Sequence, residues 1–164
     1  LQKRLWEDET GRRITDISMG PLFDDHPDDD IASGTIYVCR SHSTNEVIAN
    51  NRNNIHKIGV TNQDVSQRLS GAEEDPTFLF AKVELVATFE LYNINRKKLE
   101  SLLHKVFLPA KLKIEIPDRF GKIYRPQEWF CVPLDTIHDA VKRLKDRSLI
   151  NYKFEIKTGK LKKY

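Results

Sequence analysis

The sequence predicts a small α/β domain, in which helices flank a central, mainly antiparallel sheet of three strands. Three stretches rich in β-forming residues, 35–40, 55–61 and 78–90, supply the strands. Apolar side chains recur at helical spacing over residues 93–107 and 134–146, which predicts two helices of ordinary length. A sheet of this kind packs one face against helices and leaves the other face for chemistry.

Composition divides the chain into three parts. Residues 1–33 show no sustained period and carry 4 Lys and Arg against 9 Asp and Glu, so we interpret them as an acidic leader or linker. Residues 34–147 hold the predicted strands and helices and form the domain. Residues 148–164 form a basic tail, whose alternation around a Thr-Gly turn is typical of a small hairpin. The chain begins with Leu1 rather than Met, as expected of a piece of a longer protein.

The first two strands flank a polar loop over residues 41–54, so they are expected to form a long-looped hairpin. A short helix over residues 64–69 follows. Asn62 or Asp64 would cap its start, and Gly71 would end it. The third strand then completes the sheet.

The long helix after the third strand would be capped by Asn93 or Asn95 and stopped by Pro109. Short β-like pieces over residues 111–133 lead to the last helix. The buried stripe of the long helix consists of five residues: Leu99, Leu102, Leu103, Val106 and Phe107.

Charge is unevenly distributed and favours a polyanion as partner. The net charge of +3 combines the acidic leader with a strongly basic end, residues 142–164, which hold 9 Lys and Arg against 2 Asp and Glu. A basic surface of this kind attracts the phosphates of nucleic acid. The acidic run over residues 24–30 lacks the regular spacing of a cation-binding loop, so a solvated tail is the preferred interpretation there.

The sequence contains neither a secretory signal nor an apolar run near the ~20 residues that cross a bilayer. We therefore expect a cytoplasmic protein with no membrane partner. Its 2 cysteines, Cys39 and Cys131, are too few for a disulfide framework or a four-cysteine zinc site. Both lie in apolar, strand-like contexts and are expected to be small buried hydrophobic residues.

Alternation along the first two strands places Tyr37 and Lys57 on the same face of the sheet. The apolar residues of both strands then point to the other face and build the core. Gly59 shares the face of Tyr37 and Lys57, and is expected to open a space beside them where a ligand approaches.

The two helices add further candidates. Arg96, Glu100 and His104 form an i, i+4, i+8 row at the border of the apolar stripe of the long helix. An acid at that border reaches a shared cleft, although on spacing alone a surface acid paired with Arg96 or His104 is the simpler reading. Arg68 lies beside the anchored face of the short helix, where an ordinary surface arginine is likewise the simpler reading.

Taken together, these residues resemble the GIY-YIG nuclease superfamily, in its phage and bacterial branch related to the T5 phage domain. The resemblance covers about residues 34–145. Each motif is weak alone, but their order and spacing together are more specific. The motifs that carry it are Thr35-Ile36-Tyr37, Lys57-Ile58-Gly59-Val60-Thr61, Arg68, Glu100 to His104, and Glu128-Trp129-Phe130.

The resemblance implies a metal-dependent DNA endonuclease, expected to be the nuclease domain of a larger protein. It implies that Tyr37 activates the attacking water, that Arg68 steadies the scissile phosphate, and that Glu100 holds one divalent cation, Mg²⁺ or Mn²⁺. Lys57 replaces the second tyrosine of the superfamily, as it does in some restriction enzymes with this fold. His104 fits the branch without a universal role.

A cation close to Tyr37 would lower the pKa of its hydroxyl, which is ordinarily near 10, and favour tyrosinate as the base. We take Lys57 as the candidate for that cation. Two alternatives to the nuclease stay open: a DNA-binding module with weak or no catalysis, and a protein-interaction domain with unspecialised surface charge. The DNA preference and the oligomeric state do not follow from the sequence.

Overall fold

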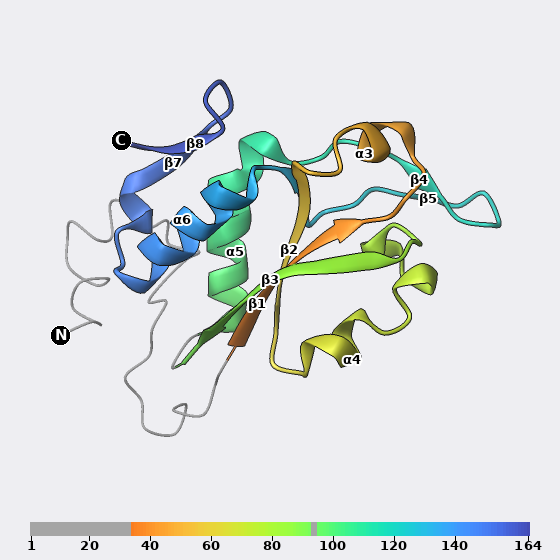
Figure 1. Cartoon of the computed structure of the whole chain (residues 1–164), viewed down its shortest axis with the longest axis horizontal. Coiled ribbons are helices and arrows are strands. Elements are labelled where there is room, and N and C mark those ends of the chain that lie inside the picture. The colour runs from red at the N-terminus through yellow and green to blue at the C-terminus, as the bar shows by residue number, and fades with distance from the viewer. Residues whose placement is uncertain (1–33, 93–94) are drawn as a thin grey trace.

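A four-stranded antiparallel sheet is the centre of the computed structural model, which describes residues 34–92 and 95–164 (Figure 1). Its strand order is β3-β1-β2-β6, so β1 and β2 are the two central strands. Tyr37 in β1 lies opposite Gly59 in β2 and opposite Thr88 in β3. The strands are β1 (Gly34–Ser41), β2 (Ile55–Thr61), β3 (Val83–Leu91) and β6 (Trp129–Cys131).

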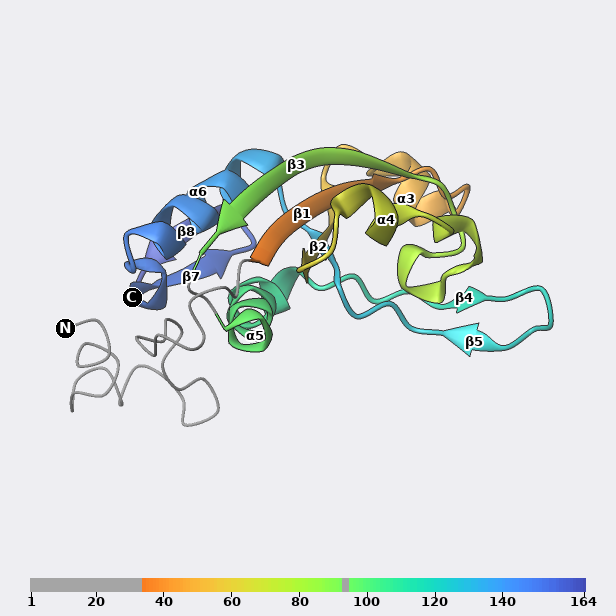
Figure 2. The same ribbon diagram turned by 90° about the horizontal axis from the view of Figure 1, so that it is seen from below.

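Two long helices, α5 (Arg96–Phe107) and α6 (Leu134–Lys145), cover one face of this sheet (Figure 2). The core lies between them and the strands, and every residue predicted for the stripe of α5 is buried in it. Burial of apolar surface stabilises a folded protein by about 25 cal/mol per Å². The packing of α5 and α6 against the sheet is therefore the main source of stability.

The opposite face of the sheet carries a smaller cover. The short helix α4 (Val65–Leu69) and the 3₁₀ turns Ala72–Glu74 and Pro76–Phe78 pack against Tyr37 and Cys39. Asp64, one of the two predicted caps, caps α4 by accepting hydrogen bonds from the backbone N–H groups of its first turn. Beneath this cover Tyr37 is almost completely buried.

Two hairpins complete the structure. The first contains β4 (Ile116–Pro117) and β5 (Ile123–Tyr124), and extends away from the sheet (Figure 2). The second pairs β7 (Tyr152–Glu155) with β8 (Lys160–Lys163), which confirms the hairpin predicted in the basic tail. Two further 3₁₀ turns, Leu108–Ala110 and Leu149–Asn151, end the helix regions.

The predicted fold class is confirmed, with local differences. The sheet has a fourth strand, because β6 adds to the outer edge of β2 over three residues. The loop over residues 41–54 contains a short helix, α3 (Glu46–Asn50), capped by Asn45. Its single buried residue, Ile48, gives too little periodicity to reveal a helix in the sequence.

The third strand begins at Val83 rather than residue 78. Leu79 and Phe80 have φ of 62° and 53°, which turns the chain sharply before the strand starts. The bond from Asn95 to the N–H of Lys98 caps α5. Two predictions lie outside the described residues: the acidic leader, residues 1–33, and the alternative cap of α5, Asn93.

The cysteines are both free, and only one is buried as predicted. Burial raises the pKa of the Cys39 thiol to about 12, so this side chain is an inert part of the core. The prediction was wrong for Cys131, which is exposed because it is the last residue of an edge strand. No helix within residues 34–92 and 95–164 has the length and apolar character needed to cross a membrane.

Candidate active site

The ring of Tyr37 lies directly over Gly59, its partner on β2. A Cβ added to Gly59 would stand 2.3 Å from Tyr37 Cζ and 2.4 Å from the hydroxyl oxygen. Glycine is therefore required there to admit the ring. The expected open space beside Gly59 was wrong, because Tyr37 itself fills it. The side chain is 2 % exposed and is held in one position.

Lys57 lies on the same face, as the alternation predicted, but it is fully buried. Its ammonium group forms an ion pair with Glu128 and lies 4.9 Å from the centre of the Phe78 ring. The Glu128 side chain is 29 % exposed, so the pair has one buried partner and one that meets solvent. Because Lys57 is buried away from water, the carboxylate of Glu128 compensates its positive charge.

Arg68 faces the same aromatic ring. Its guanidinium carbon lies 4.8 Å from the centre of Phe78, and Nη1 lies 3.5 Å from a carboxylate oxygen of Asp75. The side chain is 31 % exposed. Phe78 thus separates two cations, one buried and one accessible. The accessible one has donors left for an anion, because a guanidinium carries five N–H groups.

Glu100 and His104 reach β2 from α5 at the outer edge of the strand, beyond the short strand β6. The Nε2 atom of His104 lies 3.0 Å from the carbonyl oxygen of Ile58, to which it donates. The backbone of Val60 donates to the carboxylate of Glu100. The two side chains therefore take the place of a neighbouring strand along β2, and this fixes their positions relative to Tyr37.

Electrostatic interactions link all these groups. Burial raises the pKa of the Tyr37 hydroxyl far above its ordinary value of 10.0, which Arg68 opposes and Glu128 and Glu100 reinforce. Burial also raises the pKa of Glu100 from 4.5, and the negative charge of Glu128 adds to this rise, while His104 and Lys57 oppose it. The structure brings the five predicted residues into one cluster.

The hypothesis that Lys57 lowers the pKa of Tyr37 was wrong. The ammonium of Lys57 is engaged by Glu128, and the favourable charge that acts on Tyr37 comes from Arg68. Desolvation outweighs that charge, since burial penalises tyrosinate in the folded protein. Tyr37 is therefore a neutral phenol at physiological pH.

Glu128 is the residue of this cluster that the sequence reasoning missed. The Glu-Trp-Phe motif identified its position, but 71 residues separate it from Lys57, so no local spacing revealed the ion pair. Trp129 and Phe130 are fully buried core residues, and the indole N–H of Trp129 donates to the carbonyl of Thr77 at 3.0 Å. These contacts fix the chain on which Glu128 is carried.

The acidic side chains of the cluster are the carboxylates of Glu100 and Glu128. Among the described residues, no group of three or more His, Cys, Asp or Glu side chains is placed to hold a metal ion. Glu100 and Glu128 are two carboxylates close enough for one to raise the pKa of the other. Mg²⁺ commonly takes one or two carboxylates and completes its shell with water and substrate phosphates.

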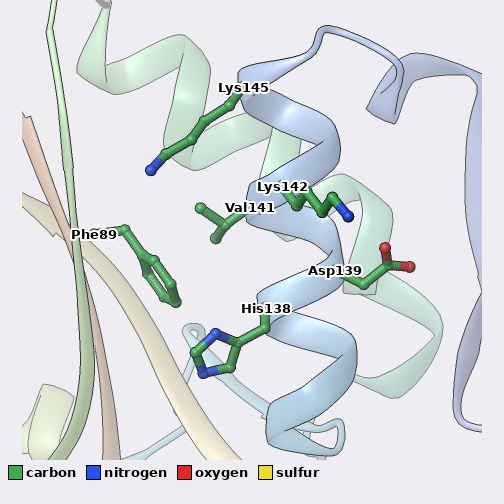
Figure 3. Close-up of a pocket in the computed structure, with 6 residues that line it drawn as sticks. All are labelled: Phe89, His138, Asp139, Val141, Lys142 and Lys145. Carbon is green, nitrogen blue, oxygen red and sulfur yellow. The ribbon is translucent and has the colours of Figure 1, made fainter.

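A separate pocket of about 490 Å³ lies between β3 and α6 and contains none of the predicted catalytic residues (Figure 3). Phe89 meets His138 edge to face, with ring centres 5.0 Å apart. Lys142 and Lys145 extend from the next turns of α6, so this pocket has a basic rim. Apart from Phe89, all its lining residues come from α6, so the pocket is separate from the site around Tyr37.

The family match identifies the chain as a phage-related domain of the nuclease-like type. The chain belongs to the T5orf172 domain family, which matches residues 34–145 and so includes every residue of the cluster. It is also 37 % identical over 131 residues to an uncharacterized protein, YeeC, of Bacillus subtilis (strain 168). That match covers 80 % of this chain and 34 % of the relative, so the chain spans about a third of the relative's length. No solved structure matches the chain.

Proposed function

We propose that this chain is a metal-dependent endonuclease domain that hydrolyses the phosphodiester bonds of DNA, with a site of the GIY-YIG type. The observation that carries the proposal is that Tyr37 lies close enough to both Arg68 and Glu100 for their charges to act on the pKa of its hydroxyl. A module that only binds DNA needs cations, but it does not need a half-buried acid beside a buried tyrosine.

Arg68 is the proposed contact for the scissile phosphate. Its guanidinium is partly exposed, and its stacking on Phe78 holds it in place. The negative charge that develops on the phosphate during hydrolysis is stabilised by a fixed cation more than the charge of the ground state is. Arg68 therefore has a role both in binding and in lowering the barrier.

Tyr37 is the proposed proton relay. Because its hydroxyl is neutral, it accepts the proton of the attacking water only as it gives up its own. Glu128, whose charge acts on Tyr37, is the nearby carboxylate that takes this second proton. Lys57 holds Glu128 in position for this step through the ion pair.

Glu100 is the proposed cation ligand. A bound Mg²⁺ or Mn²⁺ would supply positive charge to the phosphate. His104 is a positioning residue, because it donates to the backbone of β2 one turn along α5 from Glu100.

The alternative is a DNA-binding module on the same fold. The basic rim of the pocket between β3 and α6 favours it, since Lys142 and Lys145 are suited to phosphate contacts without any chemistry. The protein-interaction alternative has no comparable observation in its favour.

The decisive experiment incubates the protein with supercoiled plasmid, with and without Mg²⁺ or Mn²⁺, beside Glu100→Ala and the control Glu46→Ala. Glu46 is an exposed acid on α3, so its loss changes the net charge equally. We expect metal-dependent nicking by the wild type and the control, and none by Glu100→Ala. Salt-sensitive binding without nicking by any of the three would select the binding module instead. Linear product would indicate cutting of both strands, by a dimer or in two visits.

A further inference from the structure

The hairpin that contains β4 and β5 carries an aromatic side chain at its tip. We call residues 113–127 the β4–β5 arm. Phe120 is 81 % exposed, the largest exposed fraction given for any large hydrophobic residue of the described chain. The arm extends away from the sheet (Figure 2), and Phe120 lies in the turn between its two strands. An exposed aromatic ring at a projecting tip is typical of a binding surface.

The tip is a preformed turn. One carboxylate oxygen of Asp118 accepts from the backbone N–H of Phe120 at 2.7 Å and from that of Lys122 at 2.9 Å. Gly121 has φ of 84°, a conformation that glycine adopts without strain, and its N–H donates to the carbonyl of Asp118. The backbone that carries Phe120 is therefore preformed before any partner binds, which lowers the entropy cost of binding.

The base of the arm is fixed as well. Arg125 forms an ion pair with Glu115 at 2.6 Å across the two strands. The ring of Tyr124 meets Phe80 of the body edge to face, with centres 5.4 Å apart. Ile116 is buried in the cluster that contains Trp129. The arm is thus a rigid extension and moves with the body.

The charges around Phe120 complement a polyanion. The guanidinium carbon of Arg119 lies 4.8 Å from the centre of the Phe120 ring, and Lys122 Nζ lies 5.2 Å from that of Tyr124. Within residues 34–92 and 95–164, neither cation has an acidic partner at ion-pair distance. The acids of the arm are already engaged, since Asp118 binds the turn and Glu115 binds Arg125.

The base of the arm lies beside the segment that carries Glu128, because the N–H of Leu112 donates to the carbonyl of Trp129 at 2.8 Å. The arm follows α5, which carries Glu100 and His104, and it returns to the body at Glu128. A nucleic acid seated at the cluster would therefore pass close to the base of the arm. Aromatic side chains that project from proteins onto DNA insert between base steps or stack on bases, while neighbouring cations hold the phosphates.

We infer that the β4–β5 arm is a DNA-contacting finger, in which Phe120 stacks on a base of the bound duplex and Arg119 and Lys122 hold the flanking phosphates. This inference rests on the proposed function for its ligand. It assigns the arm a role in choosing the DNA site, because the ring engages most easily where base pairs unstack readily.

The test measures binding of a fluorescently labelled duplex by the Glu100→Ala protein, which keeps the arm and removes cleavage. In that background, Phe120→Ala is compared with Phe120→Trp, and Arg119→Ala and Lys122→Ala are each compared with the parent. The control is Tyr92→Ala, because Tyr92 is an aromatic residue that is 68 % exposed and lies outside both the arm and the basic segment 142–164. We expect Phe120→Ala to weaken binding on the order of tenfold, Arg119→Ala and Lys122→Ala to weaken it as well, and Phe120→Trp and Tyr92→Ala to bind like their parent.

A second readout places 2-aminopurine in the duplex, whose fluorescence rises when the base loses its stacking on neighbouring bases. We expect a rise with the parent protein that Phe120→Ala abolishes. Equal affinity and equal fluorescence for Phe120→Ala and the parent would overturn the inference. If the plasmid is nicked in that case, the nuclease proposal stands alone. Loss of the signal in Phe120→Ala without any nicking by the wild type would support the finger and reject the nuclease.

Discussion

The ring of Tyr37 occupies the position that a side chain at residue 59 would need, so the two residues form one packing unit across β1 and β2. The site depends on this contact because the buried ring has no other position on that face. Substituting alanine for Gly59 therefore tests how strictly Tyr37 must be placed.

Gly59→Ala is expected to displace Tyr37 and to cost about 1–3 kcal/mol of unfolding free energy through overpacking. A shift of the hydroxyl by about 1 Å would lower the cleavage rate about 10²-fold. Urea unfolding and plasmid nicking measure the two effects. The matched control is Gly71→Ala, where no atom lies within 4 Å of the added Cβ, although its φ of 75° adds strain of its own. Equal nicking by Gly59→Ala and the wild type would contradict the proposed role of Tyr37.

Removing Glu128 is expected to harm stability more than removing Lys57. Glu128→Ala leaves a fully buried ammonium group without its partner, which costs about 3–5 kcal/mol. Lys57→Met removes the buried charge and leaves a carboxylate that meets solvent, so its cost is smaller. The double variant Lys57→Met/Glu128→Ala should be more stable than Glu128→Ala alone. Urea unfolding of the three proteins checks this order, and a double variant less stable than either single one would disprove it.

Glu100→Gln is expected to stabilise the fold at neutral pH. Since burial and Glu128 raise the pKa of Glu100 in the folded protein, the folded state holds this proton more tightly than the unfolded state does. The carboxylate therefore destabilises the fold above its folded pKa, and the penalty disappears as the pH falls towards its ordinary value of 4.5. The wild type should gain stability relative to Glu100→Gln as the pH falls through that window. Unfolding at several pH values without metal measures the difference, and a constant difference would contradict the shift.

Tyr37→Phe is expected to lower the nicking rate about 10²–10⁴-fold, the usual contribution of a positioned proton-transfer group. The fold should keep its stability, because the ring still packs over Gly59. The absorbance of tyrosinate, followed with pH in the wild type and in Tyr37→Phe, isolates the phenol and should show it ionising well above pH 10. The same titration in Lys57→Met should still show a raised pKa. Ionisation of Tyr37 near neutral pH would restore the tyrosinate mechanism.

The face of the sheet on which Tyr37 and Lys57 lie was predictable, because period-two alternation depends on local sequence alone. The burial of Lys57 was not, since it depends on Glu128 and Phe78, which are distant in the sequence. The row of Glu100 and His104 followed from helical spacing, whereas their bonds to β2 depend on how α5 packs. The short β-like pieces predicted over residues 111–133 did not reveal the β4–β5 hairpin, because each of its strands has only two residues, too few for any periodicity.

The bonds from His104 and Glu100 to the outer edge of β2 give these side chains a second task in the architecture of the domain. Selection for hydrogen-bonded backbone groups at this edge of the sheet would preserve both residues in a descendant that no longer cuts DNA. The presence of these two residues without Tyr37 and Arg68 in a related sequence is thus weak evidence of an active enzyme. Arg68 makes no such bond to the backbone of the sheet, since its contacts are to the buried ring of Phe78 and to the partly exposed Asp75. Its loss from a lineage would be the earlier sign that chemistry had been abandoned.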